Sequence, residues 1–127
     1  MRAHTGIWSA RANMILVGHG TLDMDAPRLD VRLPGLEAFS PRRAVLSRSA
    51  SPEGWEGLLA PEAVFDLPGV DWLLVEGGAE TAAAFLRAGL VDRLLLYRAP
   101  ILIGGGKPCL ADLGLHALDG AHGQWRL

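Results

Sequence analysis

The chain has 127 residues, which is the usual length of one domain and leaves little room for a second. Half of the residues are hydrophobic and 20% are charged, so we expect a folded core rather than a disordered chain. The net charge of −2 gives no sign of a surface for polyanions, which argues against nucleic acid as a ligand.

The rarest residue types set further limits. The single cysteine, Cys109, excludes an internal disulfide framework and a cysteine-rich zinc site, and the four histidines show no spacing typical of metal ligands. No secretory signal pattern is present, and no apolar run approaches the roughly 18 residues that a membrane span needs. We therefore expect a single cytoplasmic domain over residues 1–127, with no metal and no membrane contact.

The first half of the chain contains two clear strand patterns. Residues 2–12 are typical of the end of a helix, and the apolar run 14–18 predicts a strand that is buried on both faces. Turn-forming residues over 19–30 predict a loop, followed by a short extended piece at 31–33. Residues 44–46 predict the second buried strand.

The second half repeats strands and helices. Residues 47–61 predict a long connection with one helical turn near Trp55, and 63–65 a short strand. A clear strand is expected at 72–75, followed by an amphipathic helix over 79–89 that ends at its glycine.

A buried strand at 94–97, a glycine-rich loop at 100–108 and weak strand signals up to 127 complete the chain. Alternation of strands with helices predicts an α/β domain with a largely parallel sheet.

The strongest local motif is Glu76-Gly77-Gly78, which joins a strand to a helix. Glycines let a ligand approach the backbone, and a helix N-terminus offers unpaired N–H groups to a phosphate. Glycines here are equally typical of a tight turn, and Glu76 is either a ligand contact or a solvated turn residue. The amides expected at such a phosphate are those of Gly78, Ala79, Glu80 and Thr81, with the Thr81 hydroxyl in reach.

A second polar segment leaves the strand at 14–18 and is expected at the same sheet edge. Thr21 can donate a hydrogen bond to an oxygen of a phosphate or ribose, Asp25 can accept one from a hydroxyl, and Arg32 can pair with a phosphate. The alternative is that these residues form turns and coat the surface.

Two further patterns give weaker indications of function. The run Gly104-Gly105-Gly106-Lys107 lacks the spacing of a phosphate-binding Walker loop, which favours a flexible surface loop. Ser47, Ser49 and Ser51 have no nucleophile-elbow context, so a hydrolase triad is unsupported.

Taken in order, several blocks resemble one known family, the C-terminal reductase domain of the bifunctional riboflavin-biosynthesis protein RibD. The blocks run through nearly the whole chain: Ile15-Leu16-Val17-Gly18-x-Gly20-Thr21, Asp25-x-Pro27-x-Leu29-x-Val31-Arg32, Leu74-Val75-Glu76-Gly77-Gly78, Ala84-Phe85-Leu86-x-Ala88-Gly89-Leu90-Val91-Asp92, Tyr97-x-Ala99-Pro100 and Gly104-Gly105. The resemblance implies a three-layer α/β/α fold similar to dihydrofolate reductase, NADPH as hydride donor and a homodimer. The implied reaction reduces the ribosylamino group of 5-amino-6-(5-phosphoribosylamino)uracil to a ribitylamino group, with a deaminase domain as a fused or separate partner.

The resemblance also assigns roles to single residues. Thr21 and Asp25 match positions that contact NADPH, while Leu29 and Arg32 match positions on the phosphorylated substrate. Glu76 matches a carboxylate at the substrate ribose and is the candidate proton donor, with another group at the strand ends, or water, as alternatives. The cofactor segment covers Gly78, Ala79, Glu80, Thr81, Ala82, Ala83 and Ala84, and Arg48 or Ser47 falls at the adenosine end of the cofactor.

The chain departs from the family at several points. It has Ser9, Asn13 and Ala26 where the family usually has an arginine and two aspartates. The family's first strand, which helps to build the substrate and nicotinamide pockets, has no counterpart, and neither has its last strand. Missing strands leave sheet edges open to association.

Two other functions fit these patterns. One is a reductase of the same fold that acts on a pterin or dihydrofolate, although Arg32 together with Glu76 favours a phosphorylated ribosyl substrate. The other is a non-catalytic nucleotide-binding fragment, which the missing first strand and Ser9 suggest.

Overall fold

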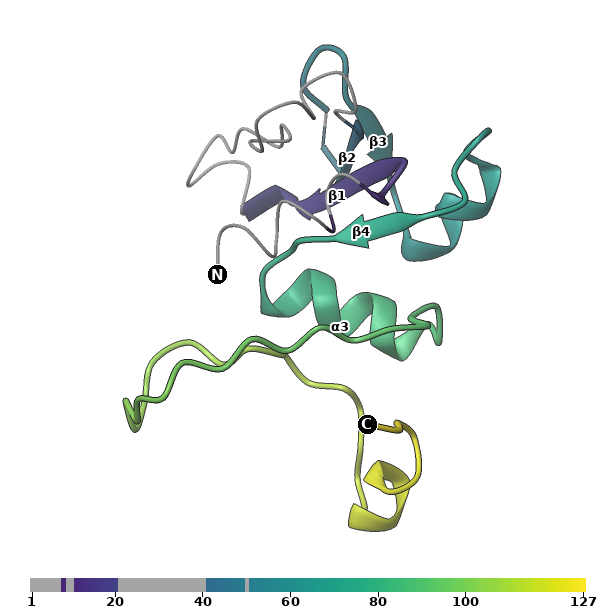
Figure 1. Ribbon diagram of the computed structural model, residues 1–127. Helices are drawn as coiled ribbons and strands as arrows, with labels where there is room; N and C mark the ends of the chain where they lie inside the picture. The colour runs from purple at the N-terminus through teal and green to yellow at the C-terminus, as the bar shows by residue number, and fades with distance from the viewer. Residues whose placement is uncertain (1–7, 9–10, 21–40, 50) are drawn as a thin grey trace.

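A computed structural model describes residues 8, 11–20, 41–49 and 51–127. Its centre is a four-stranded sheet in the order β3-β2-β1-β4, in which every neighbouring pair is parallel. The strands are β1 (Met14–Gly18), β2 (Arg42–Leu46), β3 (Glu56–Leu58) and β4 (Leu73–Val75), and helix α3 (Ala79–Arg87) follows β4 directly (Figure 1). The prediction of an α/β fold with a parallel sheet is confirmed.

Strand β1 is the most buried element of the sheet. Met14, Ile15, Leu16 and Val17 are each at most 1% exposed, which is the burial that a continuous apolar run predicts for a central parallel strand. Alternate residues enter two different clusters. Met14 and Leu16 pack with Phe85 of α3, whereas Ile15 and Val17 pack on the opposite face with Val45 and Leu74.

Asn13 fixes the start of β4 beside the start of β1. Its side-chain oxygen accepts hydrogen bonds from the backbone N–H groups of Asp71 and Trp72, at 2.8 and 2.9 Å. Its own N–H donates to the carbonyl oxygen of Trp72 at 2.9 Å. Three hydrogen bonds therefore hold the register of β4 against β1 at the amino-terminal ends of these strands.

Helix α3 covers one face of the sheet, as the amphipathic pattern predicts (Figure 1). Phe85 is 2% exposed and packs against β1, while Arg87 is exposed at the last turn. The helix ends at Ala88, and Gly89 follows with a φ of +68°, a conformation that glycine adopts without a steric penalty. The predicted glycine stop is confirmed.

Several local predictions are wrong. His19 and Gly20 are helical rather than part of a loop, and the predicted connection over 47–61 contains strand β3 instead of a helical turn at Trp55. Residues Pro61–Asp66 form a 3-10 helix, η2, where a short strand is expected at 63–65. Proline in the first turn favours this helix, because a proline there forfeits no hydrogen bond.

The largest difference between the predicted and the observed structure lies in the C-terminal third of the chain. Residues 94–97, predicted as a buried strand, pair with no strand among the described residues and are 40–64% exposed. The predicted strand signals up to residue 127 are also wrong, because the only regular element there is the 3-10 helix η3 (Leu118–Ala121). Residues 93–108, which we name the arm, project from the body of the domain (Figure 1). Apolar sequence alone does not make a strand when no neighbour accepts its backbone hydrogen bonds.

Three predictions lie outside the described residues: the loop beyond Gly20, the extended piece at 31–33, and all but Trp8, Arg11 and Ala12 of the helix at 2–12. Trp8 and Arg11 are helical, and the N–H of Ala12 donates to the carbonyl oxygen of Trp8 at 3.1 Å.

Candidate functional site

The parallel sheet brings the carboxyl ends of its strands to one edge, and α3 begins at that edge. One cavity lies at that edge, and a second runs along β4 on the other side of the helix and reaches the edge at Glu76. The polar cavity, about 730 Å³, is lined by residues that follow β1, β2 and β3 and by the outer face of α3. The β4 cleft, about 820 Å³, is lined by β4, by α3 and by residues 89–97.

The polar side chains of the polar cavity are mostly hydroxyl and guanidinium groups, set among apolar residues. Ser47 is 8% exposed, and its hydroxyl oxygen lies 2.8 Å from that of Ser49 and accepts the Ser49 backbone N–H at 3.1 Å. Arg48 is exposed at the cavity and has no ion-pair partner within the described ranges. The remaining polar side chains of the lining are those of His19, Glu80, Thr81 and Arg87. A free guanidinium beside serine hydroxyls is suited to a phosphorylated ligand.

Arg87 is held in place from the C-terminal segment. Its guanidinium donates to the carbonyl oxygen of Asp112, and the N–H of Ala111 donates to the carbonyl oxygen of Ala79 at 3.1 Å. These contacts tie residues 111 and 112 to both ends of α3. Sequence reasoning did not select Arg87, since an arginine in a last helical turn is explained by the helix dipole alone.

Thr81 fills the notch between the ends of β1 and β4. It is 7% exposed, and a Cβ added to Gly77 would lie 2.5 Å from the Thr81 Cβ, while one added to Gly18 would lie still closer to its hydroxyl oxygen. The two glycines therefore make room for a threonine side chain of the chain itself. Tight packing of the strand-to-helix turn, which the sequence left as an alternative, is what the structure shows at Gly77.

The helix N-terminus at Gly78 is free of side-chain capping. Gly78 is the N-cap residue of α3 in an extended conformation, and no side chain caps it. The N–H groups of the first helical turn carry the positive end of the helix dipole and point toward the sheet edge. Glu80 and Thr81 line the polar cavity, whereas Ala82 lines the β4 cleft.

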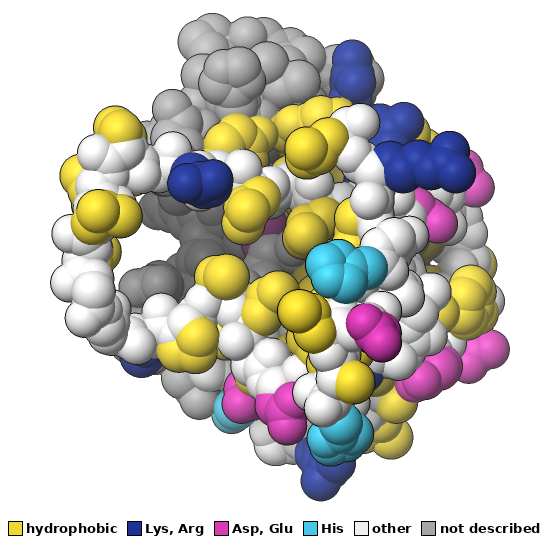
Figure 2. Space-filling model, turned by 90° about the horizontal axis from the view of Figure 1, so that it is seen from below, with side chains coloured by type: hydrophobic (Ala, Val, Ile, Leu, Met, Phe, Trp, Pro, Cys, Tyr) yellow, Lys and Arg dark blue, Asp and Glu magenta, His cyan; other side chains and the backbone are white. Residues whose placement is uncertain are grey.

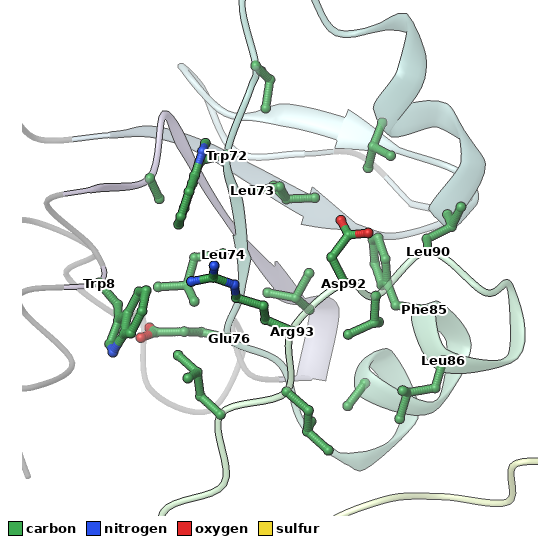
Figure 3. Close-up of a pocket in the computed structure, with 18 of the residues that line it drawn as sticks. Trp8, Trp72, Leu73, Leu74, Glu76, Phe85, Leu86, Leu90, Asp92 and Arg93 are labelled. Atoms are coloured by element: carbon green, nitrogen blue, oxygen red, sulfur yellow. The ribbon is translucent and has the colours of Figure 1, made fainter. Parts of the chain in front are cut away.

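Glu76 lies on the other side of α3, in the β4 cleft. Its backbone N–H donates to the carbonyl oxygen of Leu16 at 2.8 Å, which fixes the residue at the end of β4. Figure 3 shows the carboxylate directed toward Trp8. Burial raises the pKa of the Glu76 carboxyl above its ordinary value of 4.5, because desolvation disfavours the charged form. A carboxyl group with a raised pKa is suited to holding and releasing a proton.

Trp8, Trp72 and Arg93 line the β4 cleft, and Arg11 contacts the ring of Trp8. The Arg93 guanidinium lies 5.6 Å from the ring centre of Trp72, and that of Arg11 lies 5.5 Å from the ring centre of Trp8. Figure 3 shows Arg93 reaching across the cleft from the segment opposite β4. Neither tryptophan was predicted as a site residue, because the sequence offers no periodicity that brings positions 8 and 72 together.

Several predicted site residues lie beyond what the structure describes: Thr21, Asp25, Leu29 and Arg32. Arg48, Glu80 and Thr81 lie in the polar cavity, and Glu76 and Ala82 in the β4 cleft. Within residues 8, 11–20, 41–49 and 51–127, no group of three or more histidine, cysteine or acidic side chains is arranged to hold a metal ion. None of the helices searched in those ranges has the length and apolar character to cross a membrane.

The fold and the two cavities define a parallel α/β domain with its candidate ligand-binding edge at the start of α3. The sequence model of the RibD C-terminal domain family matches residues 61–125. The chain is 36% identical to the riboflavin biosynthesis protein RibD of Mycobacterium tuberculosis over 129 aligned residues, covering 88% of this chain and 37% of that protein. The corresponding protein of Corynebacterium ammoniagenes is 36% identical, over 84% of this chain and 36% of its own length. The chain belongs to the RibD C-terminal domain family.

Solved structures support the same fold. Acinetobacter baumannii RibD superposes with a TM-score of 0.70 and 22% identity, covering 93% of this chain and 43% of that one. A Thermotoga maritima diaminohydroxyphosphoribosylaminopyrimidine deaminase/5-amino-6-(5-phosphoribosylamino)uracil reductase gives a TM-score of 0.55 and 22% identity, over 69% and 34% of the two chains. The chain thus spans little more than a third of the length of the curated relatives named above.

Proposed function

We propose that this chain is an NADPH-dependent reductase domain that converts 5-amino-6-(5-phosphoribosylamino)uracil to its ribitylamino product. Membership of the RibD C-terminal domain family and the reductase activity in the printed name of the Thermotoga maritima protein support the substrate. One observation carries the proposal. Guanidinium and hydroxyl groups lie in the polar cavity on one side of α3, and the half-buried carboxyl group of Glu76 lies in the β4 cleft on the other side.

The polar cavity fits the adenosine end of the cofactor. Its donors are the Arg48 guanidinium, without an ion-pair partner among the described residues, and the hydroxyls of Ser47 and Ser49. The uncapped N-terminus of α3 at Gly78 supplies backbone N–H groups toward the pyrophosphate. In this arrangement the dinucleotide extends along the sheet edge from β2 toward β4, since the carboxyl ends of parallel strands form one continuous edge.

When bound, NADPH supplies a hydride to C1′ of the ring-opened sugar, and the reduction also consumes one proton. Glu76 is the candidate source of that proton, since its raised pKa keeps a larger share of the carboxyl protonated than an exposed glutamate has. By resemblance Arg32 and Leu29 both contact the substrate, and Arg32 pairs with its phosphate. Positioning of two anionic ligands face to face supplies most of the rate, because alignment converts an encounter between two molecules into a step within one complex.

The partners follow from the same family. The Thermotoga maritima protein is named as both a deaminase and a reductase, so we expect this domain to act on the product of a deaminase, whether fused or separate. A homodimer and a cytoplasmic location remain predictions from the sequence.

NADPH titration of the Arg48→Met variant tests whether the polar cavity binds the cofactor. Loss of a charge-assisted hydrogen bond, worth about 1.5–3 kcal/mol, is expected to weaken NADPH binding roughly 10- to 150-fold. Binding of NADH, which lacks the extra phosphate at the adenosine end, should change little.

Arg98→Met is the matched control, because Arg98 is an exposed arginine of the arm outside both cavities. Equal NADPH affinity in Arg48→Met and the unchanged chain would remove the polar cavity from the proposal. Glu76→Gln tests the β4 cleft separately from the polar cavity. This variant should retain NADPH binding and lose turnover.

A further inference from the structure

Arg87 is a second arginine of the polar cavity, on a different wall from Arg48. Arg48 lines the cavity from the segment after β2, whereas Arg87 lines it from the outer face of α3. The helix contributes Glu80, Thr81, Ala84 and Arg87 to this lining, at the spacing of one helical face. Arg87 is therefore the longest side chain that α3 directs along the cavity.

The Arg87 guanidinium is held by backbone rather than by an acidic side chain. It donates to the carbonyl oxygen of Asp112, while the Asp112 carboxylate accepts the N–H of Gly114 at 2.8 Å. Arg87 forms no ion pair with any residue that the structure describes. A neutral carbonyl oxygen fixes the position of a guanidinium without compensating its charge, so Arg87 keeps that charge for a ligand.

The same backbone segment shows where the guanidinium lies along the helix. The N–H of Ala111 donates to the carbonyl oxygen of Ala79, in the first turn of α3, at 3.1 Å. The next residue, Asp112, receives Arg87. The Arg87 side chain therefore reaches back from the last turn toward the first, which is the direction that helical side chains prefer. Of its five N–H donors, one is used on Asp112 within the described ranges.

Charge distinguishes the polar cavity from the β4 cleft. Two arginines and one acidic residue line the polar cavity, whereas one arginine and three acidic residues line the β4 cleft. Figure 2 shows hydrophobic side chains around the hollow beside the arm. The lining charges therefore favour an anionic group in the polar cavity over one in the β4 cleft.

The cofactor of the proposed reaction carries anionic groups at two places. NADPH has a pyrophosphate and a further phosphate on the adenosine ribose, and NADH has only the pyrophosphate. The pyrophosphate fits the uncapped N-terminus of α3 at Gly78. The further phosphate carries a charge near −2 at pH 7, which the single guanidinium of Arg48 does not neutralise. A second guanidinium on another wall supplies the missing charge.

We propose that Arg87 binds, together with Arg48, the phosphate that distinguishes NADPH from NADH, and thereby determines the cofactor preference of the chain. Residues 111 and 112 are positioning residues, because they act through Arg87. This inference rests on the proposed reductase function and deepens it, since it adds a specificity-determining residue to the cofactor site.

The test measures the dissociation constants of NADPH and NADH in the unchanged chain and in variants. Arg87→Met is expected to weaken NADPH binding roughly 10- to 100-fold and NADH binding less than twofold, because only NADPH has the phosphate. Arg87→Lys should give an intermediate loss, since lysine keeps the charge but lacks the planar fork that reaches Asp112 and a phosphate together. The double variant Arg48→Met/Arg87→Met should bind both cofactors equally within about twofold. Arg98→Met is again the matched control.

A further variant tests the positioning residues. Ala111→Pro removes the N–H that attaches this segment to Ala79. It should lower the preference for NADPH over NADH in the chain that has Arg87 and have no further effect in Arg87→Met. An equal loss of preference in both backgrounds would show that residues 111 and 112 act independently of Arg87.

Unchanged NADPH affinity in Arg87→Met, or equal losses for NADPH and NADH, would overturn the proposal, because Arg87 would then support the helix alone. A loss of NADPH affinity in Arg48→Met but not in Arg87→Met would remove Arg87 and leave the proposed reductase intact. An unchanged chain that binds NADPH no more tightly than NADH would count against both.

Discussion

The two cavities beside helix α3 differ in how many paired strands stand behind them. On the polar side, β1, β2 and β3 continue the sheet without interruption, and Ser47 and Arg48 follow β2, which is paired on both edges. On the other side, β4 is the last strand of the sheet among the described residues, and the arm lies opposite it across a cleft. The difference shows that a continuous sheet, rather than the apolar character of the sequence, decides which segment becomes an ordered wall of a site.

The largest expected effect concerns the helix that both sides share. Phe85→Ala should lower the free energy of unfolding by about 3–5 kcal/mol, because it leaves a cavity between α3 and β1. Leu96→Ala in the arm, where the side chain is 64% exposed, should change it by less than about 0.5 kcal/mol. Urea denaturation of both variants measures the contrast. Equal losses would show that the arm is packed as firmly as the helix.

Glu76→Gln tests the chemistry of the cleft side. Loss of a general acid is expected to lower kcat roughly 10²- to 10⁴-fold. The dissociation constant for NADPH should stay within about twofold, because Glu76 lies outside the polar cavity. Steady-state turnover and cofactor titration on the same preparation are the measurements. A variant with full turnover would assign the proton to water or to another group at the strand ends.

Gly18→Ala tests the packing that separates the two sides. The added methyl group would collide with Thr81, so we expect a loss of about 1–3 kcal/mol in stability. Thr81→Ala in the same chain should recover part of it, since removal of the hydroxyl and methyl groups of threonine opens the notch. The coupling energy from the four thermal or urea denaturation curves is the readout, and simple additivity of the two changes would contradict direct contact.

The smallest effect is the dependence of stability on pH through Glu76. The pKa of its carboxyl is raised in the folded chain, so the folded state binds the proton more tightly than the unfolded state does. The resulting stability is complete below pH 4.5 and is lost as the pH rises through the folded pKa. Glu76→Gln should therefore raise Tm by about one or two degrees at pH 7, since the group is only partly buried, and have no such effect at pH 4.

Control measurements with Glu80→Gln make this comparison specific. Glu80 is a carboxylate in the first turn of α3, four residues after Glu76, and it lines the polar cavity. A gain in Tm that is equal in both variants at pH 7 would reflect net charge rather than burial of Glu76.

The sequence determined those parts of the protein that local pattern controls. The apolar run at 14–18 requires burial on both faces and becomes the central strand. The apolar spacing over 79–89 predicts a helix that packs on the sheet, and Phe85 is buried as expected, whereas Ala82 and Leu86 are only partly buried. The order of motifs was enough to indicate the family and to place Arg48, Glu80 and Glu76 at one edge of the sheet.

Only the tertiary structure decided what depends on neighbours distant in sequence. Leu94–Tyr97 has the composition of a strand and lacks a paired edge, while Glu56–Leu58 has little strand character and gains one from β2. Thr81 is surrounded by Gly18 and Gly77, which no local pattern joins to it as packing partners. The physical reason is that strand hydrogen bonds and burial are shared between segments, so a sequence read along the chain cannot assign them.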